Sequence, residues 1–293
     1  MRLLFLSDFH GQLPDLSSFR ADVLVAGGDY CEVDEIRQLK FAALQRGWKA
    51  LRWPELIGRR RAEELVERAL AEGSAVVAAL ANCGLPVLAI PGNSDRVGEA
   101  LGPVGTELLA RCDPRPDRPH VAGRVTNLEG RLVLHAGVAF AGLGGWSGTE
   151  NAPPLRAEVV ALQQHWQTLR AERHARGLPV PPLVLVSHNV PHGSHLDGVD
   201  NPELPPFAQG LMVGSHRCRE ALAALSPLLC LSGHLHENYG RTERIGATLC
   251  VNGAGAYRGE AVLVEISTEG SEDGALGEPQ FVRAAAGATR QME

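Results

Sequence analysis

Short apolar runs recur along the chain, and most of them end in glycine or polar residues. Several are rich in β-branched residues, and all are too short for a buried helix, so they are typical of strands inside a covered sheet. We expect strands at residues 3–6, 23–26, 87–90, 132–134, 138–143, 183–186, 228–231, 248–251 and 261–266.

Two stretches between these runs have helical periodicity. In the first, apolar residues share one helix face: Leu155, Val159, Leu162, Trp166 and Leu169. The second extends from about residue 34 to 82, with breaks expected near Pro54 and near Gly73 and Ser74. Strands that alternate with helices and then with further strands predict an α/β protein with mixed sheets.

Length and composition favour a single domain. The chain has 293 residues, of which 44% are hydrophobic and 21% charged, as in an ordinary globular protein. We expect one domain over residues 1–266, with a helical insert at about 34–82. After Ile266, Gly, Glu, Ser and Ala crowd together, which favours a loosely held extension over 267–293.

Charge and cysteine usage exclude some classes of partner. The net charge of −6 argues against a stable nucleic-acid complex and against a nuclease acting on long DNA. Six cysteines occur without C-x-x-C spacing, which favours buried free thiols and a cytoplasmic location. We expect neither a secretion signal nor a membrane-spanning segment.

Seven residues with metal-binding side chains stand at or beside the ends of apolar runs. They are Asp8, His10, Asp29, Asn93, His188, His234 and His236. Open α/β sheets keep their ligand sites beyond the carboxyl ends of strands. Mixed imidazole, carboxylate and amide ligands suit divalent ions such as Mn, Fe or Zn, and the lack of thiolates disfavours a closed structural zinc site.

The same residues fall into five sequence blocks, in which the chain resembles the calcineurin-like metallophosphoesterases. The five blocks of that family are D-x-H, G-D-x-x, G-N-H-D/E, a lone His after a strand, and G-H-x-H. The resemblance covers about residues 1–266. The second half, from the His188-Asn189-Val190-Pro191-His192-Gly193 block onward, resembles a prokaryotic branch of small, uncharacterised phosphoesterases. The resemblance implies a four-layer α/β/β/α sandwich, in which helices flank two mixed β-sheets.

The resemblance also implies how the seven side chains divide between two metal ions. Asp8, His10 and His236 would hold one ion, Asn93, His188 and His234 would hold the other, and Asp29 would bridge them. Manganese is the favoured metal, with Fe, Zn or Ni as alternatives. Two such ions can hold a hydroxide that attacks a phosphorus atom in line.

The third block departs from the family because Ser94 stands where many relatives have histidine. Serine is too weak an acid to protonate a leaving oxygen, so we expect a phosphodiesterase rather than a monoesterase. We hypothesise that His192 or His195 replaces the missing histidine as the acid. The alternative for each is a solvated histidine in a loop. We take Asp29, Asn93 and His192 as the candidate catalytic residues.

Two residues after Ser94 also have expected roles. Asp95 should hydrogen-bond a metal ligand or a loop amide in support of the site. Arg96 would either bind phosphate or be an exposed surface arginine.

The expected activity is therefore hydrolysis of a nucleotide, a cyclic nucleotide or a nucleic-acid end. The alternatives are a phosphomonoesterase acting on a small ester, and a scaffold protein that has kept the fold and lost catalysis. The helical insert would act as a cap that limits substrate size, or would mediate formation of a homo-oligomer. The expected partner is a small phosphoester or nucleotide.

Overall fold

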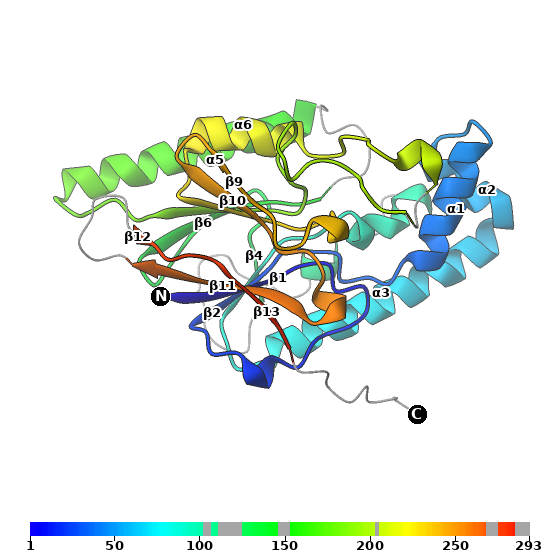
Figure 1. Ribbon diagram of the computed structural model, residues 1–293, viewed down its shortest axis with the longest axis horizontal. Coiled ribbons are helices and arrows are strands. Elements are labelled where there is room, and N and C mark those ends of the chain that lie inside the picture. Colours follow the sequence, from blue (N-terminus) through cyan, green and yellow to red (C-terminus); the bar gives the residue numbers. More distant parts are fainter. Residues whose placement is uncertain (102–106, 111–124, 146–152, 203–204, 268–274, 285–293) are drawn as a thin grey trace.

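Two β-sheets lie face to face, and helices cover the outer face of each (Figure 1). The computed structural model describes residues 1–101, 107–110, 125–145, 153–202, 205–267 and 275–284. Both sheets contain parallel and antiparallel pairs. The expected four-layer α/β/β/α arrangement of two mixed sheets is confirmed.

The first sheet is built around the N-terminal strand. Its order is β12-β11-β1-β2-β3-β4, and β13 also pairs with β11. β1 to β4 run parallel, whereas β11 is antiparallel to β1. The strands are β1 (Arg2–Leu6), β2 (Val23–Ala26), β3 (Val87–Ala89), β4 (Val125–Asn127), β11 (Glu260–Ser267), β12 (Ala275–Leu276) and β13 (Gln280–Arg283).

The second sheet comes from the C-terminal half and has the order β5-β6-β7-β8-β10-β9. Its four inner strands are parallel, and an antiparallel strand closes each edge. The strands are β5 (Leu132–His135), β6 (Val138–Leu143), β7 (Leu183–Ser187), β8 (Leu229–Ser232), β9 (Thr242–Ile245) and β10 (Thr248–Asn252).

The core between the sheets explains the continuous apolar runs. Phe5 and Val25 of the first sheet join the same buried cluster as Phe140 and Val186 of the second. Their neighbours along each strand face the other way; Leu4, for example, belongs to the cluster under the helices of the first sheet. Because both faces are covered, apolar residues follow one another without alternation.

Helices cover the two outer faces. α1 (Asp34–Gln45), α2 (Pro54–Ile57) and α3 (Arg59–Ala81) form the helical insert, while α5 (Pro153–Ala175) and α6 (His216–Leu225) cover the second sheet (Figure 1). The described helices also include α4 (Glu107–Ala110) and 3-10 helices at Leu16–Ser18, Ala50–Arg52, Ser94–Leu101, Pro206–Ala208, His236–Asn238 and Ala256–Arg258. Val159, Leu162 and Trp166 of α5 are buried as expected, and the side chain of Leu155 lies outside the described residues.

The helical insert breaks before Pro54 and at Gly58, and only the first of these breaks was expected. Pro54 begins α2, as its preference for the first helical turn predicts. The expected break near Gly73 and Ser74 is wrong, because α3 continues to Ala81. A Cβ atom at Gly73 would lie 2.5 Å from Sγ of Cys31, so this glycine serves close packing. The Ser74 hydroxyl donates back to the carbonyl of Leu70 within the helix.

The segment after Ile266 is not loose where the structure describes it. β12 pairs with β11 at Ser267 and Ile266, and β13 pairs with β11 from Glu260 to Leu263. The expectation of a loosely held extension is therefore wrong for residues 275–284. Residues 268–274 and 285–293 lie outside the described residues.

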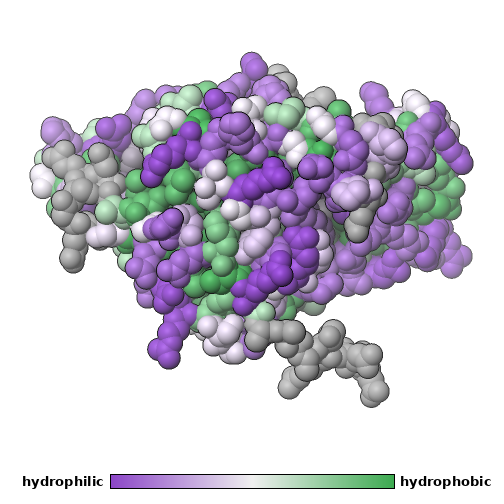
Figure 2. Space-filling model, in the orientation of Figure 1, coloured by the Kyte–Doolittle hydropathy of each residue, from purple (hydrophilic) through white to green (hydrophobic). Residues whose placement is uncertain are grey.

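The described cysteines are free thiols. Cys31, Cys218, Cys230 and Cys250 are buried as expected, Cys83 is half-buried, and Cys112 lies outside the described residues. None of the helices that the structure describes is both long and apolar enough to cross a bilayer. On the face drawn in Figure 2, hydrophilic residues predominate and apolar residues form separate patches.

Candidate metal centre

The seven predicted ligands follow the carboxyl ends of five parallel strands. In the first sheet, Asp8 and His10 follow β1, Asp29 follows β2, and Asn93 follows β3. In the second sheet, His188 follows β7, and His234 and His236 follow β8. A hydrogen bond joins the two sheets at this edge, where Nδ1 of His188 lies 2.8 Å from the carbonyl oxygen of Gly27.

Four of these residues have a left-handed backbone, which is uncommon for residues other than glycine. The φ angles of Asp8, His10, Asp29 and His234 are 63°, 44°, 58° and 70°. Such conformations cost on the order of 1–3 kcal/mol each and persist only where the surroundings enforce them. The sharp turns after these strands are therefore held under strain at the place where the polar side chains meet.

Asp8, His10 and His236 form one group of possible ligands. Nε2 of His236 lies 3.1 Å from Oδ1 of Asp8 and 3.2 Å from Nε2 of His10. The ligand atoms of the three residues all lie within 4.8 Å of one another. The structure thus brings together the side chains expected to hold the first metal ion.

Asp8, Asp29 and His188 form a second group within the same distance limit. Nε2 of His188 lies 3.4 Å from Oδ1 of Asp29 and 3.0 Å from Oδ1 of Asn93. The ring of His234 packs edge-on against that of His188, with 5.2 Å between their centroids. Asp29 also approaches the first group, because its Oδ2 lies 4.0 Å from Nε2 of His10.

The electrostatics favour the protonation states that a metal ion needs at Asp8, Asp29 and His234, whereas Asp29 and Asp8 raise the pKa of His188. Burial tends to raise the pKa of Asp8, but the hydrogen bond and charge of His236 bring it well below its usual range. Burial likewise opposes the charge of Asp29, whose pKa is nevertheless lowered by His188 and His10. Burial, together with His188, lowers the pKa of His234 to about 4, so its ring is neutral at pH 7.

This donor set fits a divalent metal ion. Asp8 and Asp29 are almost completely buried carboxylates, and such groups require cations or hydrogen-bond donors nearby. Ring nitrogens from three histidines point at their oxygen atoms, and Nδ1 of His10 is buried without a partner among the described residues. A metal ion would be held by Asp8, His10 and His236, or by Asp8, Asp29 and His188.

Asp95 supports the turns that carry the ligands. Its carboxylate accepts hydrogen bonds from the backbone N–H groups of Asp29, Tyr30, Cys31 and Gly92, at 2.6–3.1 Å. Burial and the charge of Asp29 raise its pKa to about 7. The expected hydrogen bonding of Asp95 to loop amides is confirmed.

Ser94 points at the central carboxylate. Its hydroxyl donates to Oδ2 of Asp29 at 2.8 Å, and its backbone N–H donates to Oδ1 at 2.7 Å. Ser94 is 3% exposed. The residue that replaces the family's histidine therefore helps to orient Asp29.

Arg96 is buried, so the expectation of an exposed surface arginine is wrong. Its guanidinium donates to the carbonyl of Gly145 and forms an ion pair with Glu129. Arg217 donates to the preceding carbonyl, that of Gly144, so two buried arginines fix this turn. A phosphate could bind Arg96 only by displacing these protein acceptors.

Gly145 packs directly against the site. A Cβ atom there would lie 2.4 Å from Cδ2 of His188 and 2.6 Å from the backbone nitrogen of Asn93. The arginines that hold residues 144 and 145 thus fix the wall behind two predicted ligands.

The two histidines proposed as acids lie in the loop after β7. Nδ1 of His192 lies 3.2 Å from Oδ2 of Asp197, and its ring packs against His216 with centroids 3.8 Å apart. The backbone N–H of His195 donates to Glu243, and the residue is exposed. The described contacts of His192 are thus within its own loop and with α6.

A cavity of about 520 Å³ lies beside His10 and His236, and sequence reasoning missed its other lining residues, among them Tyr257 and Arg37. Tyr257 packs edge-on against His10, at 5.5 Å between centroids, and also contacts the ring of His236. Arg37 reaches the cavity from α1 of the insert. Neither residue belongs to one of the five sequence blocks. For Tyr257, the glycine-rich turn after β10 was the only feature of the sequence that could have indicated a place near the site.

Comparison with known proteins places these observations in a family. The sequence matches the calcineurin-like phosphoesterases over residues 1–238. No curated protein shows significant sequence similarity to the chain. One solved crystal structure, 15% identical, covers 97% of this chain and 99% of its own with a TM-score of 0.53, which supports the fold.

Two further solved structures are more distant in shape. The TT1561 protein of Thermus thermophilus is 16% identical, with 97% of this chain and 99% of its own covered and a TM-score of 0.48. Phosphopantetheinyl hydrolase from Mycobacterium tuberculosis is 16% identical, with 87% and 89% covered and a TM-score of 0.39. Since the family match covers well over half of the sequence, the chain belongs to the metal-dependent calcineurin-like phosphoesterases.

Proposed function

We propose that this protein hydrolyses phosphodiester bonds with two divalent metal ions, Mn being the first choice. The observation that carries the proposal is the position of Asp29, whose two oxygens face His188 on one side and His10 on the other. Bound ions would supply Lewis acidity and an activated water molecule. The protein itself would hold the ligand atoms in fixed positions around the ions.

The preference for diesters rests on Ser94. Its hydroxyl is already donated to Asp29, and a hydroxyl is in any case too weak an acid to protonate an alkoxide leaving group. A diester therefore suits this site where another residue protonates its leaving oxygen, the role proposed below for His192. The proposed substrates are therefore a nucleotide diester, a cyclic nucleotide or a nucleic-acid end, with a small phosphomonoester as the alternative.

The cavity beside His10 and His236 is the proposed place for the rest of the substrate. Its volume of about 520 Å³ suits a small molecule. Arg37 and Arg258 line it from different elements, α1 and the turn after β10, and are paired there with Asp34 and Glu260. A phosphate oxygen would bind either guanidinium in competition with these carboxylates. The insert thereby contributes a wall, which supports its expected role as a cap.

His192 stays a proposed acid for the leaving group. Support for it is limited to its place in the loop that follows His188 and to its contact with the buried carboxylate of Asp197. The pH profile of His192→Ala tests the role. An acid or alkaline limb that matches the wild type would exclude it.

We also propose a cytoplasmic location and assembly into a homo-oligomer. The free thiols support a reducing, cytoplasmic environment. Leu44 and Leu51 of the insert are 41% and 50% exposed, and they are candidates for contact in a homo-oligomer. We propose no membrane partner and no stable nucleic-acid complex.

The decisive experiment compares bis-(p-nitrophenyl) phosphate with p-nitrophenyl phosphate under Mn, together with metal analysis. We expect two ions per chain and a higher kcat/KM on the diester. Asp29→Asn should lose both metal binding and activity, whereas the exposed Asp22→Asn should lose neither. Faster hydrolysis of the monoester would favour the monoesterase, and fewer than two ions with no hydrolysis would favour a silent scaffold.

A further inference from the structure

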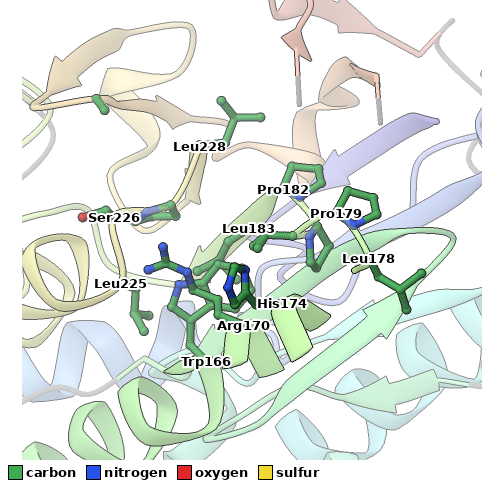
Figure 3. Close-up of a pocket in the computed structure, with 14 residues that line it drawn as sticks. Trp166, Arg170, His174, Leu178, Pro179, Pro182, Leu183, Leu225, Ser226 and Leu228 are labelled. Atoms are coloured by element: carbon green, nitrogen blue, oxygen red, sulfur yellow. The ribbon is translucent and has the colours of Figure 1, made fainter. Parts of the chain in front are cut away.

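A second cavity, of about 490 Å³, lies far from the candidate metal centre. Its walls come from the C-terminal half of α5, the loop that leads into β7 and the loop between α6 and β8 (Figure 3). These loops lie at the starts of β7 and β8, whereas His188 and His234 follow the ends of the same strands. The cavity therefore opens at the opposite edge of the second sheet.

Three side chains of α5 face this cavity with unused hydrogen-bond donors. Trp166, Arg170 and His174 are spaced four residues apart, so they share one helix face, and Figure 3 shows them side by side. In the described part of the chain, none of these side chains has a hydrogen-bond or ion-pair partner. Arg170 and His174 are exposed, so a guanidinium and an imidazole at the surface lie beside the mostly buried indole of Trp166.

The rest of the lining is apolar and carries no acid. Proline and leucine side chains supply most of it, with Ser226 at one end, and no Asp or Glu is among the described residues that line the cavity. The positive charge of Arg170 is therefore uncompensated at this place.

One wall is fixed before any ligand binds. Nε of Arg173 donates to the carbonyl of Pro179 at 2.9 Å, which ties the loop to the end of α5. Pro181 and Pro182 continue this loop, and proline restricts the backbone. Trp166 is 6% exposed, so its ring is held by the core below. A preformed wall lowers the entropy cost of binding.

We propose that this cavity, the α5 pocket, binds a small organic anion with a planar apolar body. The guanidinium of Arg170 would take the anionic head, either a carboxylate or a phosphate, in a two-point contact. The indole of Trp166 and the proline-rich loop would cover the body. The volume lies within the range of small-molecule sites, about 300–1,000 Å³.

The test is calorimetric titration of the full chain with three naphthalene probes. 1-Naphthoate and 1-naphthylphosphonate carry the two anionic heads, and 1-naphthamide is the neutral counterpart. At least one anion should bind with one-to-one stoichiometry and about tenfold more tightly than the amide, since one charge-assisted contact contributes about 1.5 kcal/mol or more. The tighter of the two anions identifies the head group.

Variants locate the binding. Arg170→Met keeps the length of the side chain and should weaken the tighter anion about tenfold, with the amide unaffected. Arg219→Met, at an exposed position of α6 outside the cavity, is the matched control and should change nothing. Asp29→Asn should also bind normally, which separates this pocket from the metal centre.

Several results would overturn the proposal. They are absence of binding by both anions, equal affinity for the amide, or unchanged affinity in Arg170→Met. Loss of binding in Asp29→Asn would place the anion at the metal centre instead. Circular dichroism of each variant shows that it is folded, and His174→Gln, which should weaken the same anion, gives a second variant on this helix face.

Discussion

Ser94 and Asp29 are joined by two hydrogen bonds, one from the serine hydroxyl and one from its backbone N–H, to different oxygens of the carboxylate. A carboxylate held at both oxygens cannot rotate freely, and its remaining lone pairs have fixed directions. Many relatives have histidine at this position. Here the serine has a structural role, which is to orient the carboxylate of Asp29.

Ser94→Ala should weaken binding of Mn about tenfold, because loss of one outer hydrogen bond to a ligand typically costs 10- to 100-fold in metal affinity. The backbone N–H of residue 94 remains, so binding should not disappear. Calorimetric titration of Mn measures the change. Ser194→Ala, which removes a buried hydroxyl bonded only to its own loop, is the control and should bind Mn as the wild type does.

Gly145→Ala should abolish tight metal binding while the protein stays folded. The added methyl group would overlap His188 and the backbone of Asn93, and both would have to move. Gly198→Ala is the control, because its nearest contact is the sulfur of Met212 at 4.0 Å. Normal metal binding by Gly145→Ala would show that these two residues can shift without loss of the site.

Arg96→Met should lower the free energy of unfolding by about 3 kcal/mol, because it leaves Glu129 and the carbonyl of Gly145 without their donor. Urea denaturation measures the loss. Arg60→Met should have no effect, since the Arg60 side chain is 94% exposed. Lower substrate affinity with unchanged stability would instead support the phosphate-binding role.

Lys40→Met should raise the stability at pH 7. Burial lowers the pKa of Lys40 below its ordinary value of 10.5, with Asp29 and Glu99 acting in the opposite direction. The folded state therefore carries an unfavourable charge below the lowered pKa, and this cost vanishes above 10.5. Thermal unfolding measures the stability of Lys40→Met. Lys49→Met, at an exposed position, is the control. Destabilisation by Lys40→Met would mean that the acidic neighbours outweigh burial.

The pH dependence of stability should reverse when metal binds. Burial disfavours the charged ring of His188, but Asp29 and Asp8 raise its pKa overall. In metal-free protein the bound proton stabilises the fold at low pH, and this contribution is lost as pH rises through the raised pKa. A metal ion needs the neutral ring, so its affinity should increase over the same range. Thermal unfolding above pH 6.5, the ordinary pKa of histidine, should give opposite slopes with and without Mn.

The apolar runs predicted the central strands well, because strands covered on both faces leave a continuous signal. All nine expected strands are present. The edge strand β9 (Thr242–Ile245) was missed, since its residues alternate between exposed and half-buried and include Glu243 and Arg244. α6 was missed because its buried face includes Arg217, which pairs with Glu158 and so looks like a surface residue in the sequence.

The candidate site was predictable where it consists of recognised blocks, since each block places a polar residue just after a strand. Arg37 and Tyr257 could not be found in this way, because they reach the cavity from a helix of the insert and from a turn after β10. Their position depends on packing between distant segments. Arg96 was misjudged for the same reason: its acceptors are 33 and 49 positions away.

The pairing of β1 with β11 joins the strand before Asp8 and His10 to a segment more than 250 residues later. Asp8 and His10 are made long before the antiparallel neighbour of their strand, which spans Glu260–Ser267. A chain released at residue 238, where the family match ends, would contain all seven candidate ligands and leave one edge of β1 open. Contacts so distant in sequence form slowly, and open strand edges promote aggregation. The strand that carries Asp8 and His10 therefore keeps one open edge until the residues of β11 have been made.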